Sequence, residues 1–241
     1  MTIPEDLKSW SEALSAAKSY ADAILLNSLN QVGGILSDTI GHWRLRNQVR
    51  LMLKTKEYLE EKKIRPEKIL PEIFIPLLED GGNVENEDLT KMFASLLASH
   101  LDPDSQDLVH PSYTKVLAQI SPLDAKVMVE FRKHTSDKEY RDLGLRGGPL
   151  VITFLAGLVG IDSNNTYLSC LNLNRLGIIH LVGYQAPDSH PMPYVFEDSL
   201  EHQEFRITEY GISFCDACHH CKDDSTLYWG KNQSRLSENA E

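Results

Sequence analysis

The chain has 241 residues, which is enough for one large domain or two small ones, each with a buried core. Its formal net charge of -11 disfavours indiscriminate binding to nucleic acid. No apolar run approaches the roughly 18 residues needed to span a bilayer, and the N-terminus lacks a secretory pattern, so the sequence predicts a cytoplasmic protein.

Residues 13–40 are rich in small and apolar side chains and are interrupted by Gly33 and Gly34. Polar residues such as Asp22 and Asp38 make the region too polar to span a membrane. The pattern favours a helical hairpin packed on the rest of the protein. Insertion of residues 13–40 into a membrane is the alternative.

The next segment is strongly basic. Residues 41–68 contain nine Lys and Arg residues against four acids. Within it lies Arg44, and in a helix Arg46, Arg50 and Lys54 fall on one stripe. The favoured interpretation is a solvated face that pairs with acidic segments of the same chain. The alternative is a surface for an anionic partner such as RNA, DNA or acidic lipid.

Helix start and stop signals follow one another closely between residues 69 and 131. Asn86 is a candidate helix cap, Asp102-Pro103 ends that helix, and His110-Pro111-Ser112 and Ser121-Pro122 start the next two. These signals predict an N-terminal helical domain over residues 1–119.

The pattern changes after residue 120. Helices are predicted at 121–134, 150–160 and 166–176, the third ended by Gly177. Strands are predicted at 178–182 and 205–208, and a last helix at 210–220. This order is typical of a winged-helix domain with residues 166–175 as the recognition helix. The predicted fold is therefore mainly α, with a winged-helix-like α+β domain over residues 120–222.

The charge of this second domain disfavours DNA recognition. Arg175 is the only cation of the helix in the recognition position, and the following loop, residues 185–204, carries five acids. Because phosphate neutralisation supplies most of the affinity of DNA-binding domains, a structural or protein-docking role is favoured.

Cysteines cluster near the end of this domain. Cys215, Cys218 and Cys221 lie three residues apart, and His219 would complete a four-ligand zinc site. Zinc sites usually draw ligands from two segments, so the favoured interpretation is that Cys215 and Cys218 pack as small apolar groups. Cys215, Cys218 and His219 also match a haem attachment signature, but that chemistry belongs to exported proteins.

The remaining residues, 223–241, are predicted to form a polar tail. Leu227, Tyr228 and Trp229 are an apolar run within it and a candidate contact for a homo-oligomer.

No catalytic signature is complete. His100 and Asp102 are close in sequence, but a polar helix end is the commoner explanation for them. Neither a Gly-x-Ser-x-Gly elbow nor a His-Glu-x-x-His motif occurs. A protein without enzymatic activity is therefore favoured.

Several strings of this chain resemble the bacterial abortive-infection alpha family, formerly a domain of unknown function. They are residues 70–73, 93–98, 110–113, 121–125, 172–178 and 207–214, within a match from about residue 44 to 218. The resemblance implies a role in the defence of bacteria against phage. It implies no reaction, because it carries no catalytic motif.

Three functional hypotheses follow. The first is a non-enzymatic phage-defence factor that binds a protein partner, either a phage product or a toxin component. The second is a nucleic-acid-binding regulator that uses residues 44–68 and the winged helix. The third is a membrane-active effector that uses residues 13–40.

Overall fold

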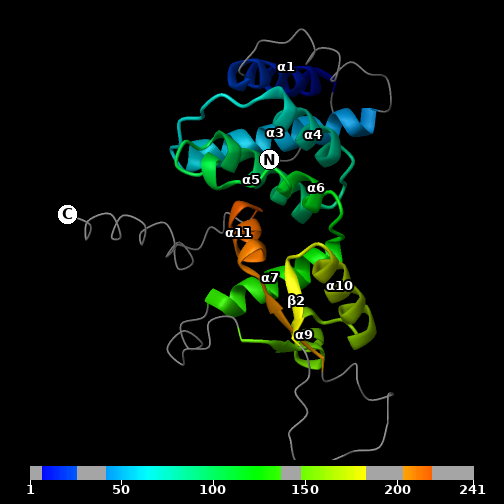
Figure 1. Cartoon of the computed structure of the whole chain (residues 1–241). Helices are drawn as coiled ribbons and strands as arrows, with labels where there is room; N and C mark the ends of the chain where they lie inside the picture. The colour runs from blue at the N-terminus through cyan, green and yellow to red at the C-terminus, as the bar shows by residue number, and fades with distance from the viewer. Residues whose placement is uncertain (1–6, 26–41, 137–147, 183–202, 219–241) are drawn as a thin grey trace, which may run out of the picture.

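The computed structural model describes residues 7–25, 42–136, 148–182 and 203–218. In these ranges the protein is mainly helical with one small antiparallel sheet, as the sequence predicts (Figure 1). Four predicted features lie wholly or partly outside the described residues: the second half of the 13–40 region, most of the acidic 185–204 loop, the end of the last helix and the 223–241 tail.

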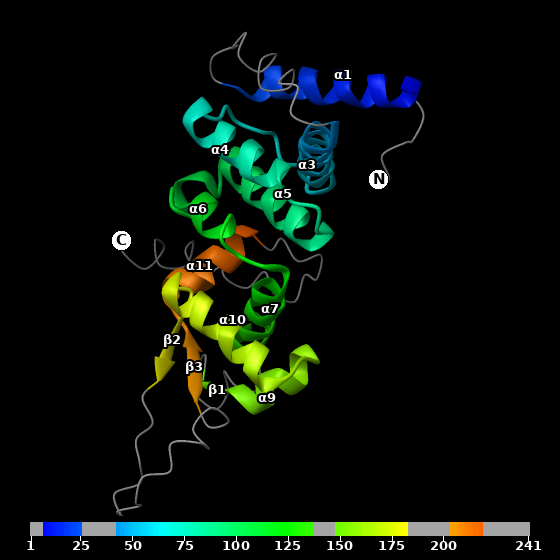
Figure 2. The ribbon, with the colours of Figure 1, turned by 90° about the vertical axis from the view of Figure 1, so that its right-hand side faces the viewer.

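Helix α1 (Leu7–Ile24) lies across α3 (His42–Glu61) at one end of the molecule (Figure 2). Ala17, Ala21 and Ile24 are buried along one face of α1, so its apolar side packs against protein. Packing of the first half of the 13–40 region is therefore observed. Among the described helices, none is both long and apolar enough to cross a membrane.

Helix α5 (Glu87–Leu101) is the centre of the N-terminal half. It packs against α3, α4 (Pro71–Gly82) and α11 (Glu209–Cys218). Asn86 Oδ1 accepts hydrogen bonds from the backbone N–H groups of Asp88 and Leu89, both at 3.0 Å, which confirms the predicted cap. Eleven residues of α5 are buried, so the helix is surrounded on most sides.

The turn before α6 (Tyr113–Leu117) differs from the prediction. The sequence placed the helix start at Pro111, but α6 begins two residues later. The Tyr113 N–H donates to the His110 carbonyl, and His110 Nδ1 accepts from the Ser112 N–H at 3.2 Å. These local bonds close a separate turn before the helix. A short 3-10 helix (Gln106–Leu108) precedes it.

The C-terminal half begins with α7 (Pro122–Ser136), whose start is capped as the sequence indicates. Ser121 N–H donates to Asp124 Oδ2 at 2.8 Å, and Asp124 N–H donates to Ser121 Oγ at 3.1 Å. This reciprocal pair satisfies two backbone donors at the helix end.

Strand β1 (Leu150–Val151) then leads into α9 (Ile152–Val159), α10 (Ser163–Arg175) and the strands β2 (Ile179–Val182) and β3 (Glu204–Ile207). The sheet order is β1-β3-β2, and both pairings are antiparallel.

The two predicted strands are confirmed to within two residues at their ends, but β1 was missed. Residues 150 and 151 form only two ladder pairs, too few to produce a period-two pattern. Helix α10 begins three residues before its predicted start, because Asp162 caps it by accepting from the Asn165 N–H at 2.9 Å. Gly177, with φ of +76°, ends it as predicted.

Helix α11 joins the two halves (Figure 1). Ser99 Oγ of α5 donates to the Ala217 carbonyl at 3.0 Å, and Arg132 of α7 pairs with Asp216 at 2.6 Å. Phe214, Cys215 and Cys218 are buried in one continuous apolar core that includes residues from both halves. The domain boundary at residue 119 stays a prediction. Helix α11 contacts α5 on one side of this boundary and α7 on the other.

We predict that Gly211→Ala destabilises the fold strongly. A Cβ at this position would lie 2.0 Å from the Ile178 carbonyl oxygen, so α11 would have to move away from the end of α10. The expected cost is on the order of 2 kcal/mol or more. Urea unfolding monitored by circular dichroism measures it. Gly157→Ala is the matched control, because nothing lies within 4 Å of its Cβ and alanine favours α9. Equal midpoints for the two variants would contradict the prediction.

We predict that stability falls as the pH drops from 6.5 towards 4, because of His100. Its side chain is 7% exposed, and burial lowers its pKa from 6.5 to about 4. Below pH 6.5 the unfolded chain binds a proton that the native state does not, so unfolding becomes easier, by up to about 3 kcal/mol near pH 4. Urea unfolding between pH 7 and 5 tests this. His100→Gln should flatten the slope; an unchanged slope would refute the assignment.

Candidate functional site

One residue of the basic stripe predicted on α3, Lys54, forms an ion pair within the chain. Lys54 Nζ lies 3.4 Å from Glu87 Oε1, and the Lys54 side chain is 19% exposed. Lys54 and Lys91 hold the pKa of the Glu87 carboxyl below its usual range, and Arg50 contributes in the same direction. Arg44 Nη2 donates to the Glu79 carbonyl at 3.4 Å. Pairing with an acidic segment of the chain is thus observed for Lys54, whereas Arg44 donates to a backbone carbonyl, which leaves its charge unpaired.

Arg46 differs from its neighbours. Its side chain is exposed on α3, and it makes no ion pair within the described part of the chain. Binding of an anionic partner by Arg44, Arg46, Arg50 and Lys54 stays a prediction, with Arg46 as its most accessible member.

The cysteine cluster is divided by the structure. Cys215 and Cys218 are 0% and 1% exposed, and neither forms a disulfide within the described residues. Burial raises the pKa of the Cys218 thiol well above its usual value, and the neighbouring Cys215 adds to the effect. Since zinc binds the thiolate, this environment favours packing over coordination. Cys221 and His219 lie outside the described residues.

No group of three or more His, Cys, Asp or Glu side chains that could hold a metal occurs among the described residues. Asp102, which the sequence placed near His100, ends α5. Its carboxylate accepts from the Asp104 N–H at 3.0 Å and from Ser105 Oγ at 2.9 Å. These bonds account for Asp102 without a metal. Assembly of Cys215, Cys218, Cys221 and His219 into a zinc site stays a prediction.

Ser112 lies in a short polar chain that suggests a nucleophile and its base. Its Oγ is 2.8 Å from His110 Nδ1 and 2.6 Å from the Tyr210 hydroxyl. However, His110 Nδ1 also accepts from the Ser112 backbone N–H, so the imidazole caps the turn before α6. The Tyr210 hydroxyl links this turn to α11. The hydrogen bonds that join His110, Ser112 and Tyr210 are therefore explained as a structural connection between the two halves.

Helix α10, which the sequence predicts as a recognition helix, exposes two leucines. Leu168 is 54% exposed and Leu171 is 38% exposed, while Thr166, Cys170 and Leu173 face the core. Asn164 and Arg175 fall on the same outer side as the leucines. We call Asn164, Leu168, Leu171 and Arg175 the α10 outer face.

Three polar side chains of α10, those of Asn165, Asn172 and Arg175, are already engaged by the protein. Arg175 Nη2 donates to Asn172 Oδ1 at 2.8 Å and Nη1 donates to Gln119 Oε1 at 3.1 Å. Asn172 Nδ2 donates to the buried Asp124 carboxylate at 2.9 Å. Asn165 Nδ2 donates to Asp162 at 2.7 Å. A base or phosphate that binds Asn165, Asn172 or Arg175 would have to displace these partners.

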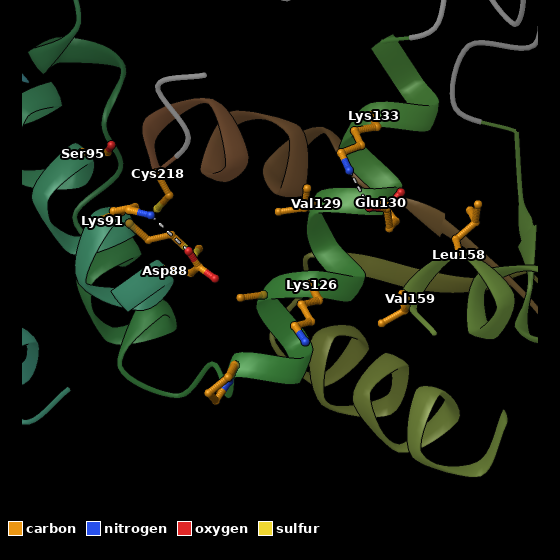
Figure 3. Close-up of a pocket in the computed structure, with 13 residues that line it drawn as sticks. Asp88, Lys91, Ser95, Lys126, Val129, Glu130, Lys133, Leu158, Val159 and Cys218 are labelled. Carbon is orange, nitrogen blue, oxygen red and sulfur yellow. Dashed lines mark hydrogen bonds and ion pairs between the residues drawn. The ribbon is translucent and has the colours of Figure 1, made fainter. Parts of the chain in front are cut away.

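A cleft of about 500 Å³ opens between α5, α7 and α9, with the end of α11 at its edge (Figure 3). Its apolar surface includes the buried Met92 and Ala125 and the half-buried Val129 and Val159. We call it the α7 cleft. Charged side chains, Asp88, Lys91, Lys126, Glu130 and Lys133, stand around it. An apolar floor with a charged rim suits an amphipathic segment rather than a small polar substrate.

Most charges of this rim are paired. Lys133 lies 2.6 Å from Glu130, and Lys91 lies 3.4 Å from Asp88 (Figure 3). Lys126 is exposed and has no ion-pair partner in the ranges that the structure describes. The rim therefore offers one free positive charge beside an apolar floor.

Sequence reasoning did not identify the cleft, because its residues were explained by helix packing. The available signal was on α7. Six of the residues that line the cleft recur at one-face spacing along α7, and no described element covers this face. They are Pro122, Ala125, Lys126, Val129, Glu130 and Lys133.

A comparison with family models matches residues 46–218 to the family described as Abortive infection alpha. No curated protein and no solved structure gives a significant match. The matched range runs from within α3 to the last residue of α11. It therefore includes the α10 outer face, the α7 cleft and all six strings quoted in the sequence analysis. It covers well over half of the chain, and the chain therefore belongs to the abortive infection alpha family.

Proposed function

We propose that this protein is a phage-defence factor that acts without catalysis, by binding a protein partner through the α10 outer face. Membership of the abortive infection alpha family supports a role in abortive infection. The observation that carries the mode of action is the exposure of Leu168 and Leu171 on a helix whose only cation is bonded to Gln119 and Asn172.

We also infer that residues 120–222 include a winged-helix-like domain. Support comes from the order α7, β1, α9, α10, β2, β3 and from the antiparallel sheet order β1-β3-β2. In such a domain α10 has the recognition position. Two exposed leucines three residues apart present apolar area there, which a protein partner can bury and a phosphate backbone cannot.

The surroundings of the leucines are consistent with a protein interface. Asn164 and Arg175 stand at the two ends of the α10 outer face and can supply a polar rim. A phage product or a toxin component is the class of partner that an abortive-infection role requires. Burial of the leucines would supply the contact energy, and the rim would orient the partner.

We predict that Leu168→Glu combined with Leu171→Glu abolishes protection against phage. Charges placed at the centre of an apolar contact would cost roughly 2 kcal/mol or more, which weakens binding at least about tenfold. Plaque counts on expressing cells measure protection, and quantitative pulldown from infected lysate compares the captured partner with that of the unchanged chain.

Leu70→Glu is the matched control, because Leu70 is also an exposed leucine, at 41%, but lies at the start of α4. It should retain protection. Circular dichroism spectra should coincide for all variants. Full protection by the double variant would rule out the α10 outer face as the binding site.

A second candidate is a nucleic-acid-binding regulator, favoured only by the free charge of Arg46. In this case we predict that Arg46→Glu removes co-purifying nucleic acid, read as the ratio of absorbance at 260 and 280 nm. Arg46 is preferable to Lys54 for this test, because reversing Lys54 would also repel Glu87. Protein that purifies free of nucleic acid and binds none at low salt would eliminate this function.

A further inference from the structure

The α10 outer face has a two-fold pattern. The midpoint between Leu168 and Leu171 and the midpoint between Asn164 and Arg175 are the same point, between residues 169 and 170. All four side chains are exposed, and Figure 1 shows α10 on the outer side of the C-terminal half. Read from either end, the face therefore presents a polar residue, two leucines and a polar residue.

A face with this pattern can pair with itself. If a second copy lays its α10 antiparallel across the first, a two-fold axis passes through the shared midpoint. Leu168 of each copy then lies level with Leu171 of the other, and Asn164 lies level with Arg175 of the other. The four leucines bury one another at the centre, where an interface gains most of its contact energy.

The charges of α10 favour this antiparallel arrangement. Arg175 is the only charged residue of the helix. In an antiparallel pair the two arginines stand at opposite ends, about 16 Å apart along the axis, so salt screens most of their repulsion. Asp162, which caps α10, stands at the same end as Arg175 of the other copy. A parallel pair would instead bring the two arginines together, so electrostatics selects the antiparallel order.

Arg175 is already held in place for such a contact. Its Nε and Nη2 donate to Asn172 Oδ1 at 3.2 and 2.8 Å, and its Nη1 donates to Gln119 Oε1 at 3.1 Å. Both acceptors are neutral amides, so these bonds orient the guanidinium without neutralising its charge. Three of its five N–H groups are used in these bonds, which leaves two for an acceptor on another chain.

We propose that two copies of this chain associate through their α10 outer faces, antiparallel about a two-fold axis between residues 169 and 170. The interface centre is small, so the dimer should be weak and should depend on concentration. It covers the leucines that the proposed function assigns to a protein partner, but it does not require that partner. A partner must therefore displace the second copy, and self-association keeps the face covered until a tighter ligand is present.

Sedimentation velocity of the full chain, from low-micromolar to near-millimolar concentration, tests the contact. We expect a monomer–dimer equilibrium. Leu168→Glu combined with Leu171→Glu should abolish it, because four like charges would meet at the centre. Leu70→Glu should leave it unchanged, because Leu70 is an exposed leucine at the start of α4. Circular dichroism spectra of these variants should coincide with that of the unchanged chain.

Substitutions of Asn164 test the register without touching the leucines. Asn164→Glu should tighten the dimer several-fold, because the carboxylate lies level with Arg175 of the other copy. Asn164→Lys should weaken it several-fold. Arg175 of the same chain is about 16 Å away along the helix, so these effects act between copies. In a chain that also carries Arg175→Gln, Asn164→Glu should give no gain.

Three results would overturn the inference. They are a chain that stays monomeric at every concentration, a dimer that survives the double leucine variant, and a dimer whose affinity neither Asn164 variant changes. Failure of the inference is distinguishable from failure of the proposed function. A monomer that loses protection with the double leucine variant would contradict the dimer alone. A dimer that this variant dissociates without loss of protection would contradict only the partner proposed above.

Discussion

The packing of α11 against α5 and α7 is the constraint on which the rest of the structure depends. Phe214, Cys215 and Cys218 are buried in a core shared by both halves, and the Ser99 hydroxyl and the Arg132 guanidinium bind the same turn of α11. A helix from the end of the chain therefore closes a scaffold begun before residue 60. The close approach of Gly211 to Ile178 connects this helix to the sheet.

This constraint decides which polar residues remain available for function. The hydroxyls of Ser99 and Ser112 hold α11, and Asp124 holds both the start of α7 and Asn172 of α10. These hydroxyl and carboxylate groups are thus used to join helices. Among the described residues, the leucines of α10 and the α7 cleft are accessible apolar features, and such features suit the binding of another protein segment.

Charged side chains show the same division between groups that hold the structure together and groups that stay accessible. On α3, Lys54 pairs with Glu87 and Arg44 donates to the Glu79 carbonyl, so the protein holds part of the basic segment in place. Burial likewise changes the chemistry of Cys218 and His100, since it disfavours the charged form of each. Stability, rather than reactivity, is the property that these buried groups determine.

The sequence by itself determined the helices, their caps and the family, because these depend on contacts within a few residues. Asn86, Asp124 with Ser121, and Gly177 have the predicted roles. Only the tertiary structure decided the joining of the two halves, the neutralisation of Lys54 and the α7 cleft. Each of these depends on residues distant in sequence, such as Lys54 with Glu87 or Met92 with Val159, and periodicity along one chain cannot say which distant faces meet.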